Sequence, residues 1–451
     1  MEDPLPGYEG KLRELLESKG ARVGCRIRIT RFGGREIIEG LLMPKHAFSS
    51  PYVVVLKLDN GYNIGVEVRE DTSIEVLECR TPPKAMRIKL APRPELPYVK
   101  VIGTGGTIAS KVEYETGAVK PSMSPEDLVE LIPELMDVAN IDSEVLFNIL
   151  SENMTPYHWQ VLAERIAKLI TNESFKGFVV AHGTDTMSYT AAALAFALQK
   201  LPCPIVLVGA QRSSDRPSTD AALNFLSAVL TAVHAPFGEV VVCMHATPSD
   251  TLSLVHRGVK VRKMHSSRRD AFQSINDLPL AKVDPISKKF EIINKRFIPR
   301  ASKDELVVKP KFDDRVALIK AYPGFQAEII DMLVDRGFHG IVIEGTGLGH
   351  IAENVIPSIK RAIESGVAVV MTTQTLFGRI NMNVYTTGRK LLQVGVIPGE
   401  DMLPEVAYVK LSWVLAQTRD LNEVKRMMLH NYVNEINYVH TLELYPRWIE
   451  L

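Results

Sequence analysis

Apolar and polar positions follow first a helical spacing and then a strand spacing in the N-terminal part of the chain. Between residues 10 and 20, three leucines recur on one face of a helix. Residues 26–29 then alternate between arginine and isoleucine, 53–58 is an apolar run rich in valine, and 73–79 is a further strand candidate. The pattern therefore predicts one short amphipathic helix followed by several short strands.

Turn signals separate these predicted strands. Asp59-Asn60-Gly61 is a strong hairpin signal because Asn and Gly tolerate positive φ, and Gly33-Gly34 marks a second turn. Several short strands within a short stretch of chain are typical of a small antiparallel barrel. We expect residues 1–80 to form a small all-β barrel-like domain, and the proline-rich residues 81–97 to form a linker.

From Tyr98 the pattern changes to strand, turn and helix, repeated. Continuous apolar runs are typical of parallel strands that are covered on both faces. Helix start signals lie between the runs, at Ser124-Pro125 and Thr155-Pro156, where a capping residue precedes a proline. We therefore expect a doubly wound α/β domain with a parallel sheet at residues 98–295. Its candidate strands are 98–103, 177–181, 204–209 and 239–244.

A polar stretch interrupts this pattern, and the α/β alternation resumes after it. We expect an interdomain linker at 296–312 and a smaller C-terminal α/β domain at 313–451. The candidate strands of the smaller domain are 316–321, 340–344 and 367–371. The predicted fold class is thus α/β, with a larger doubly wound parallel-sheet domain and a smaller α/β domain behind a small all-β domain.

Composition and charge limit which classes of partner and which cellular compartment fit this chain. Lys plus Arg and Asp plus Glu both number 53, so no net charge draws a polyanion to the whole molecule. The acidic start and the lack of a bilayer-length apolar run predict a cytoplasmic protein without membrane contact. The four cysteines are far apart in the sequence, and we expect them to be buried and reduced.

Basic side chains gather in the sequence of the N-terminal domain. A solvated strand face explains them at least as well as contact with RNA does, and both interpretations stay open. The residues are Arg22, Arg26, Arg28, Arg31 and Arg35.

Two motifs carry candidate chemistry, and each directly follows a predicted parallel strand. Gly103-Thr104-Gly105-Gly106-Thr107 brings backbone N–H groups close to a ligand and ends in a threonine that can act as a nucleophile. His182-Gly183-Thr184-Asp185-Thr186 supplies hydroxyl and carboxylate groups. Because ligands bind at the carboxyl ends of parallel strands, we expect both motifs at the same edge of the sheet.

Each motif also has a plainer explanation. The glycine-rich turn could bind phosphate, although its spacing matches neither the dinucleotide nor the P-loop pattern. Thr186 is expected to be the N-cap of the next helix, whereas Asp185 could face the crevice. A third glycine-rich segment, 345–350, looks nucleotide-like, but we interpret it as a turn at the domain interface. The eleven histidines show no metal-ligand spacing.

Together the two motifs resemble the L-asparaginase/glutaminase family. The similarity runs from Tyr98 nearly to the C-terminus and includes the shorter segments 209–212, 270–272 and 415–418. Their order along the chain fits one βαβαβ unit between the two motifs. The resemblance implies a pair of asparaginase-like α/β domains, catalytic roles for Thr107, Thr184, Asp185, Lys263 and Tyr114, and substrate contacts at Ser151, Glu152, Gly106 and Gly183.

The implied chemistry fits these residue types. A threonine hydroxyl is a poor nucleophile until a base takes its proton. Tyr114 could take the proton directly, and a neutral Lys263 could take it through Thr184, so the sequence leaves the base open. Backbone N–H groups near Thr107 could stabilise the tetrahedral oxyanion. We expect no metal and no organic cofactor in this chain.

One position departs from the family pattern. Glutamine commonly follows the serine at this point of the family, whereas this chain carries Glu152 after Ser151. A carboxylate attracts the substrate ammonium more strongly and could change which amino acid fits. The choice between glutamine and asparagine therefore stays open.

The N-terminal domain extends the resemblance. A free-standing asparaginase would normally begin at the position that corresponds to Tyr98 of this chain, so residues 1–97 are an addition. A small leading barrel and linker resemble the glutamine-hydrolysing component of archaeal glutamyl-tRNA(Gln) amidotransferases. This resemblance implies a homodimeric glutaminase that passes ammonia to a transamidase/kinase partner subunit of the GatE type. That partner would use ATP and Mg²⁺ to convert Glu-tRNA(Gln) to Gln-tRNA(Gln), so the complex acts as a ligase.

Three other functions stay open at this point. The first is a free-standing L-asparaginase with an appended domain. The second is a scaffold or RNA-binding protein without catalysis, which the complete set of Thr107, Thr184, Asp185 and Lys263 argues against. The third is a nucleotide-binding dehydrogenase, which the absence of its glycine fingerprint disfavours.

Overall fold

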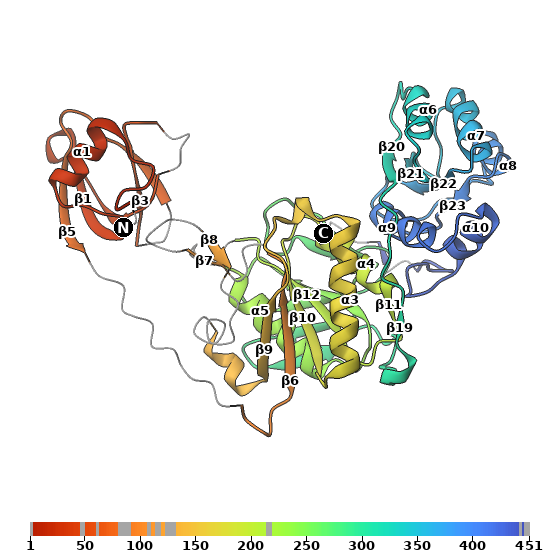
Figure 1. The fold of residues 1–451 in the computed structure, drawn as a ribbon, viewed down its shortest axis with the longest axis horizontal. Coiled ribbons are helices and arrows are strands. Elements are labelled where there is room, and N and C mark those ends of the chain that lie inside the picture. Colours follow the sequence, from red (N-terminus) through yellow and green to blue (C-terminus); the bar gives the residue numbers. More distant parts are fainter. Residues whose placement is uncertain are drawn as a thin grey trace, which may run out of the picture.

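The computed structural model divides into an all-β N-terminal domain and two α/β domains (Figure 1). The predicted fold class is confirmed. The structure describes residues 3–45, 50–59, 63–79, 92–105, 110–112, 119–121, 132–212, 219–441 and 444–445.

The N-terminal domain is one antiparallel sheet with a helix packed against it. The helix α1 (Gly10–Ser18) buries Leu12 and Leu16 in the domain core, as the helical spacing predicts. The sheet has the strand order β4-β3-β2-β1-β5. Its strands are β1 (Cys25–Arg31), β2 (Glu36–Leu42), β3 (Val53–Lys57), β4 (Asn63–Glu67) and β5 (Ser73–Cys79).

The predicted turns lie where the sheet reverses direction. Gly33 and Gly34 have φ of 63° and 92° in the short turn between β1 and β2, a conformation that favours glycine. Asn60 and Gly61 lie outside the described residues, as does most of the proline-rich stretch, but β3 and β4 pair antiparallel on either side of the predicted hairpin turn.

One cysteine prediction is wrong. Cys25 and Cys79 form a disulfide, because the antiparallel register of β1 and β5 sets these two residues directly opposite each other. Sequence separation alone could not reveal this, since the two cysteines stand 54 positions apart. Cys203 and Cys243 are free and buried, as expected, and burial raises the pKa of each thiol to about 12.

Loss of this disulfide should destabilise the N-terminal domain. In the chain-entropy view, a crosslink that closes a loop of this length stabilises the fold by about 4 kcal/mol. We expect Cys25→Ser with Cys79→Ser to lower the free energy of unfolding of the N-terminal domain by roughly that amount, measured by chemical denaturation. Under strong reductant the wild type and the double variant should unfold alike; a persistent difference would contradict the assignment.

The arginines of β1 are paired with acidic residues on the neighbouring strands β2 and β5 and in the turn after β3. Arg28 binds Glu39 of β2 at 2.7 Å and Glu75 of β5 at 3.2 Å. Arg26 binds Asp59 at 2.6 Å, and Arg31 binds Glu36 at 2.6 Å. These cross-strand pairs neutralise the charge, which favours a solvated strand face over an RNA-binding patch.

The large domain is built on a mixed eight-stranded sheet of order β18-β17-β14-β13-β12-β10-β6-β9. The five strands from β13 to β9 run parallel; four of them were predicted, whereas β9 was not, and three antiparallel strands extend the sheet at the other edge. The parallel strands are β6 (Tyr98–Gly103), β9 (Asn140–Val145), β10 (Gly177–Ala181), β12 (Ile205–Val208) and β13 (Val240–His245). The antiparallel strands are β14 (Ser253–Arg257), β17 (Ala281–Asp284) and β18 (Lys289–Ile292).

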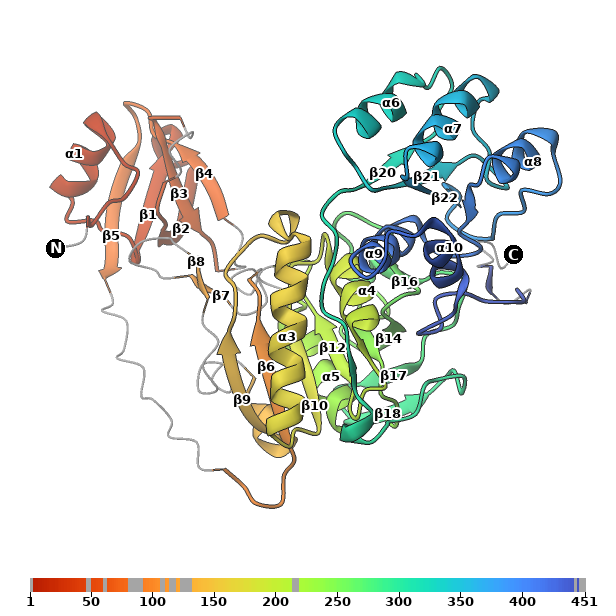
Figure 2. The same cartoon turned by 45° about the vertical axis from the view of Figure 1, so that its right-hand side comes forward.

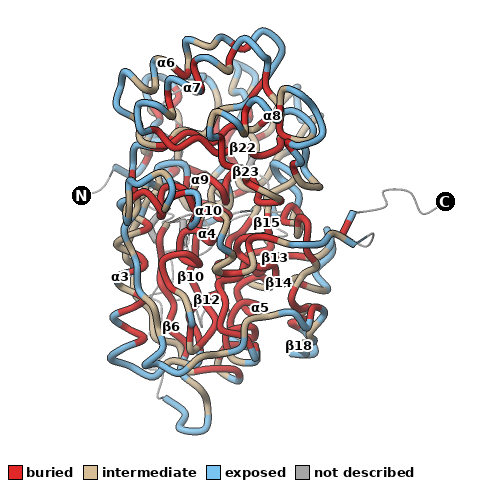
Figure 3. Tube along the Cα trace, turned by 90° about the vertical axis from the view of Figure 1, so that its right-hand side faces the viewer, coloured by how far each residue is buried: buried red, intermediate tan, exposed pale blue. Residues whose placement is uncertain are grey.

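Helices cover both faces of this sheet, so its central strands β10, β12 and β13 are buried on each side (Figures 2 and 3). One core contains side chains of α3 (Pro156–Asn172) and α4 (Met187–Ala197), and the core on the other face contains those of α5 (Ala221–His234). The double cover explains why these strands are continuous apolar runs. Thr155 caps α3 as predicted, whereas the helix signal at Ser124-Pro125 lies outside the described residues.

Short elements complete the large domain. Three two-stranded ribbons are present among the described residues, together with two 3₁₀ turns, η2 (Pro133–Asp137) and η3 (Ser151–Asn153). The ribbons are β7 (Ser110–Val112) with β8 (Val119–Pro121), β11 (Leu198–Gln199) with β19 (Val307–Val308), and β15 (Val261–Lys263) with β16 (Phe272–Ser274).

The small domain is a four-stranded parallel sheet of order β20-β21-β22-β23. The segment at 345–350 forms a turn after β21, closed by an isolated bridge between Thr346 and His350. The strands are β20 (Val316–Lys320), β21 (Gly340–Gly345), β22 (Ala368–Thr373) and β23 (Ile397–Pro398). The helices are α6 (Glu328–Asp335), α7 (Ile356–Glu364), α8 (Thr386–Gln393), α9 (Pro404–Leu415) and α10 (Leu421–Leu429), and two more 3₁₀ turns, η4 (Lys303–Glu305) and η5 (Glu353–Val355), precede β19 and α7.

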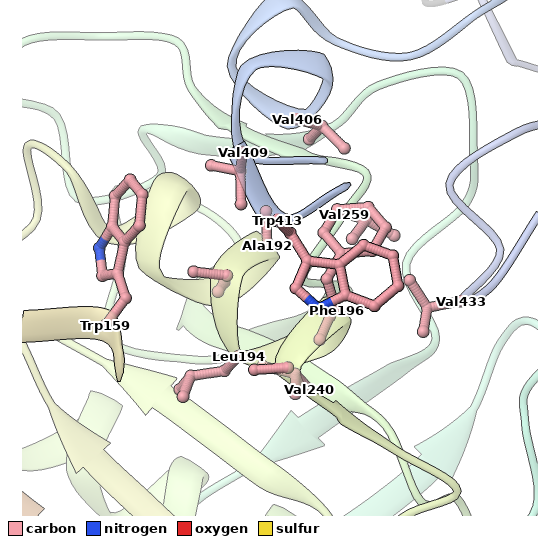
Figure 4. Close-up of a cluster of buried hydrophobic side chains, with 14 of the residues drawn as sticks. Trp159, Ala192, Leu194, Phe196, Val240, Val259, Val406, Val409, Trp413 and Val433 are labelled. Atoms are coloured by element: carbon pink, nitrogen blue, oxygen red, sulfur yellow. The ribbon is translucent and has the colours of Figure 1, made fainter. Parts of the chain in front are cut away.

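The two α/β domains share one hydrophobic core. Phe196 of α4 stacks on Trp413 of α9 with ring centroids 5.7 Å apart, inside a cluster of buried side chains drawn from both domains (Figure 4). Burying two large aromatic rings together favours a fixed domain arrangement. Within the described ranges, every helix is too short or too polar to cross a lipid bilayer.

Candidate active site

The ends of neighbouring parallel strands meet at the start of the glycine-rich turn. The backbone N–H and the side-chain hydroxyl of Thr104, just after β6, both donate to the carbonyl of Ala181 at 3.0 Å. Ala181 is the last residue of β10 and immediately precedes the His182–Thr186 motif. These bonds fix the first motif against the second, which confirms their expected juxtaposition at one sheet edge.

A third segment, which follows β9, closes the same edge. Gly105 has φ of 110° and lies so close to this segment that a Cβ atom would stand 2.1 Å from the carbonyl oxygen of Ile149. Only glycine accommodates both conditions. The close approach leads directly into Ser151, which is buried at the start of η3.

Ser151 packs against the second motif. A Cβ on Gly183 would lie 2.8 Å from the Ser151 hydroxyl, so the missing side chain makes room for it. The hydroxyl of Thr186 donates to the Ser151 carbonyl at 2.6 Å. Thr186 is indeed the N-cap residue of α4, but its side chain caps no helix N–H and instead bonds to the segment that contains Ser151.

Lys263 reaches the same motif from the end of β15. Its ammonium donates to the hydroxyl of Thr184 at 2.9 Å and to the carboxylate of Asp185 at 2.7 Å. The lysine side chain is 13% exposed and the aspartate side chain 69% exposed, so this ion pair stands at the rim of the site. The fold therefore brings Lys263 to Thr184 and Asp185, which stand 79 and 78 positions before it in the sequence.

The structure says less about the other predicted site residues. Thr107, Gly106 and Tyr114 lie outside the described residues, and their roles stay predictions. Glu152 follows Ser151 on η3 and is exposed. Its predicted contact with the substrate stays a prediction.

His182 supports the motif from beneath, a role that sequence reasoning missed. One ring nitrogen lies 2.6 Å from the Gly183 carbonyl and the other 2.9 Å from the Thr190 hydroxyl. The Trp159 indole donates to that hydroxyl at 3.2 Å. Full burial lowers the pKa of His182 to about 4, because the charged ring would be desolvated. A histidine that opens a motif after a buried strand was the only available signal.

This burial predicts acid sensitivity. The unfolded chain protonates His182 near its ordinary pKa of 6.5, whereas the folded chain does so only near 4, so stability is lost as the pH falls from 6.5 to 4. Between pH 7 and pH 5 the contribution of this residue should fall by about 2 kcal/mol. Denaturant unfolding of wild type and His182→Gln at both pH values measures it; equal pH slopes would contradict the assignment.

Comparison with proteins of known family decides the assignment. The D subunit of glutamyl-tRNA(Gln) amidotransferase from Metallosphaera sedula is 53% identical over 98% of this chain and 99% of its own length. The corresponding protein of Pyrococcus furiosus is 54% identical over 94% of this chain and 97% of its own. The chain belongs to the family of glutamyl-tRNA(Gln) amidotransferase D subunits.

Profiles of known domains match this chain in three consecutive segments. They are described as GatD N-terminal domain (residues 21–77), Asparaginase, N-terminal (98–296) and Glutaminase/Asparaginase C-terminal domain (315–428). The chain is therefore an asparaginase-type amidohydrolase with an added N-terminal domain, as the sequence predicts. Enzymes of the asparaginase family need no cofactor.

Solved asparaginases resemble the two α/β domains. The thermostable L-asparaginase of Thermococcus kodakarensis superimposes with a TM-score of 0.67 at 32% identity, over 75% of this chain and 99% of its own. L-asparaginase I of Vibrio cholerae gives 0.66 at 29%, over 76% and 99%. Both asparaginases are matched almost completely, whereas about a quarter of this chain has no counterpart in them.

Proposed function

We propose that this chain is the glutaminase subunit of a tRNA-dependent amidotransferase. It hydrolyses L-glutamine to glutamate and supplies the ammonia to a transamidase/kinase partner subunit of the GatE type. That partner converts Glu-tRNA(Gln) to Gln-tRNA(Gln) with ATP and Mg²⁺. The observation that carries the proposal is the contact of Lys263 with Thr184 and Asp185, in a chain that resembles its curated relatives over nearly its full length.

The proposed reaction proceeds through an acyl-enzyme. The hydroxyl oxygen of Thr107 attacks the side-chain amide carbon of glutamine while a base takes the hydroxyl proton. Collapse of the tetrahedral intermediate breaks the C–N bond, and the leaving nitrogen departs as ammonia after gaining that proton. Water then hydrolyses the ester, which releases glutamate and restores the threonine.

The described geometry constrains how Thr184 takes part. Its oxygen accepts a hydrogen bond from Lys263, so its own O–H is directed to another partner. In this state Thr184 can donate to the developing oxyanion or to the leaving nitrogen. Accepting a proton from the nucleophile requires the reverse polarity, with Lys263 neutral. Tyr114 is the alternative base.

The substrate contacts follow from the same three strand ends. Ser151 and the backbone at Gly106 and Gly183 would hold the α-carboxylate and the reacting amide. Glu152 and Asp185 would hold the α-ammonium, since both carboxylates stand at the exposed rim. Two carboxylates around one ammonium give a strong, salt-sensitive attraction for an amino-acid substrate.

The second candidate function is a free-standing L-asparaginase. The solved asparaginases that resemble the α/β domains favour it. The N-terminal segment argues against it, because residues 21–77 match the GatD N-terminal domain.

The proposal also covers the oligomeric state and the domain limits of the chain. We propose a homodimer that works with its partner protein on Glu-tRNA(Gln) in the cytoplasm. The proposed domain limits are 1–80, 98–295 and 313–451, with linkers between them. The stretch 296–312 also pairs with the large domain, through β19 and β11.

Ammonia release by the purified full-length chain tests the function. Glutamine and asparagine are compared with and without the partner protein and charged tRNA, and Thr107→Ala serves as the inactive control. Preference for glutamine, raised by partner and tRNA and lost in Thr107→Ala, supports the proposal. Faster, partner-independent release from asparagine would replace it with the asparaginase function.

A further inference from the structure

The strand that ends in Lys263 belongs to a small hairpin outside the main sheet. The hairpin pairs β15 with β16, so that Lys263 lies opposite Phe272. At the loop end of the hairpin, the Met264 N–H donates to the Ala271 carbonyl at 2.6 Å, so these two residues close the loop. A two-stranded ribbon holds its own shape weakly, so the position of the lysine depends on what anchors the ribbon.

An ion pair ties the loop of this hairpin to the large sheet. Arg269 is 11% exposed, and its guanidinium binds the Asp250 carboxylate at 2.6 Å and the Pro248 carbonyl at 3.3 Å. Asp250 lies in the segment that follows β13. The contact therefore links the loop of residues 264–271 to the carboxyl end of a central strand.

A buried polar chain continues from Asp250. The His245 ring lies 3.2 Å from Asp250 through one nitrogen and 2.5 Å from the Asn224 side-chain oxygen through the other. Asn224 is oriented by its amide nitrogen, which donates at 3.0 Å both to Asp220 and to the Gly209 carbonyl. Both ring nitrogens of His245 therefore face oxygen atoms, and the ring links Asp250 to Asn224.

The far end of the chain lies behind Thr184. Asp220 accepts from the backbone N–H groups of Gln211 and Arg212, at 3.0 and 2.9 Å. These residues follow β12, next to Gly209, where an added Cβ would stand 2.7 Å from the methyl of Thr184. One connected network thus fixes the loop beyond Lys263 and the backbone on which Thr184 packs.

We propose that Arg269 and Asp250 are positioning residues for glutamine hydrolysis. Their ion pair, continued through His245 and Asn224, sets the distance between the Lys263 ammonium and the Thr184 hydroxyl. The inference rests on the proposed function, because it assigns these residues to the reaction at that site. Misplacing a catalytic group by about 1 Å can cost around a hundredfold in rate, so an anchor of this kind affects turnover strongly.

The test compares Arg269→Met and Asp250→Asn with wild type in the full-length chain. We expect kcat for glutamine to fall tenfold or more in both, with KM changed less than threefold. Arg269→Lys, which keeps the charge, should recover part of the loss. Hydrogen exchange of the backbone amides of residues 264–271 should become faster in Arg269→Met, whether or not substrate turns over.

Arg268→Met is the matched control. Arg268 stands in the same loop, but its guanidinium binds Asp270 within that loop and, in the described part of the chain, makes no ion pair outside it. We expect its kcat to stay within twofold of wild type and its exchange rates to stay unchanged.

A further cycle separates positioning from general destabilisation. If Arg269 acts through Lys263, adding Arg269→Met to Lys263→Met should lower the residual rate by less than twofold. The positioning role would be overturned if Arg269→Met lowered the rate of the Lys263→Met variant by the same factor as it lowers that of wild type. An Arg269→Met enzyme with wild-type kcat would overturn it as well. A wild type that releases no ammonia from glutamine would overturn the proposed function as well, so the two failures are distinguishable.

Discussion

Replacing Lys263 by methionine is expected to lower kcat for glutamine hydrolysis about a thousandfold. The ammonium is the described group that contacts both Thr184 and Asp185, and methionine keeps an unbranched side chain one atom shorter while removing every proton that the amine can give or take. General acid–base groups contribute about 10²–10⁴-fold to turnover. Single-turnover measurement of ammonia release gives the chemical step directly.

The binding of substrate should change much less. Ser151 and Glu152 lie on a separate segment after β9, so the KM for glutamine should stay within about threefold of wild type. Thr184→Val should produce a loss of similar size, and the double variant should be no worse than the poorer single variant, since the two residues act as one unit.

A matched control lies on the small domain. Lys360 is exposed on α7 and pairs with Glu364 one helical turn away, so Lys360→Met should leave kcat unchanged. Retention of more than a tenth of wild-type kcat by Lys263→Met would contradict the catalytic role of the lysine and redirect attention to Tyr114 as the base.

Replacing Lys260 by methionine is expected to lower the free energy of unfolding by about 3–5 kcal/mol. The ammonium of Lys260, in the turn before β15, binds Asp401 of the small domain at 2.7 Å, and both side chains are fully buried. Burial lowers the pKa of Lys260, and the Asp401 carboxylate opposes this shift. Removing the ammonium leaves the Asp401 carboxylate buried with its contacts to His440 and Asn437 but without its lysine partner, which is the costly case.

Two further variants decide the cause of that loss. Asp401→Asn in the Lys260→Met background removes the stranded charge and should recover part of the stability, while it keeps an acceptor for the Asn437 N–H, which Asp401 binds at 2.7 Å. Lys282→Met breaks an exposed pair with Glu291 on β17 and β18 and should cost less than about 1 kcal/mol. Denaturant unfolding measures all of them. A cost for Lys260→Met as small as that for Lys282→Met would show that the buried pair does not hold the domains together.

The sequence revealed strand positions well where burial left a clear pattern. Residues 98–103, 177–181 and 340–344 were expected as strands, and the structure has β6, β10 and β21 there. The antiparallel strands β14, β17 and β18 were not expected, because they are short and partly polar. Periodicity is weak in such short strands, and their structure is decided by pairing: β14 pairs with β13, β17 with β14 and β18 with β17.

The site shows the same division. The two motifs were found in the sequence because each follows a predicted parallel strand, and Lys263 was assigned through the resemblance to the asparaginase/glutaminase family. Their distances were not available from it, since Lys263 is 79 residues from Thr184 and reaches it through a hairpin outside the main sheet. The support from His182 and the anchor formed by Asp250 and Arg269 could not be predicted either, because ordinary polar residues carry no signal of their partners.

The sequence by itself determined the fold class, the order of the domains and the chemical identity of the candidate catalytic groups. These depend on local periodicity and on motifs, which are properties of neighbouring residues. Only the tertiary structure decided the disulfide between Cys25 and Cys79, the cross-strand pairing of the arginines and the contact of Lys263 with Thr184. These depend on strand register and on the packing of segments distant in sequence, which the chain fixes only when it folds.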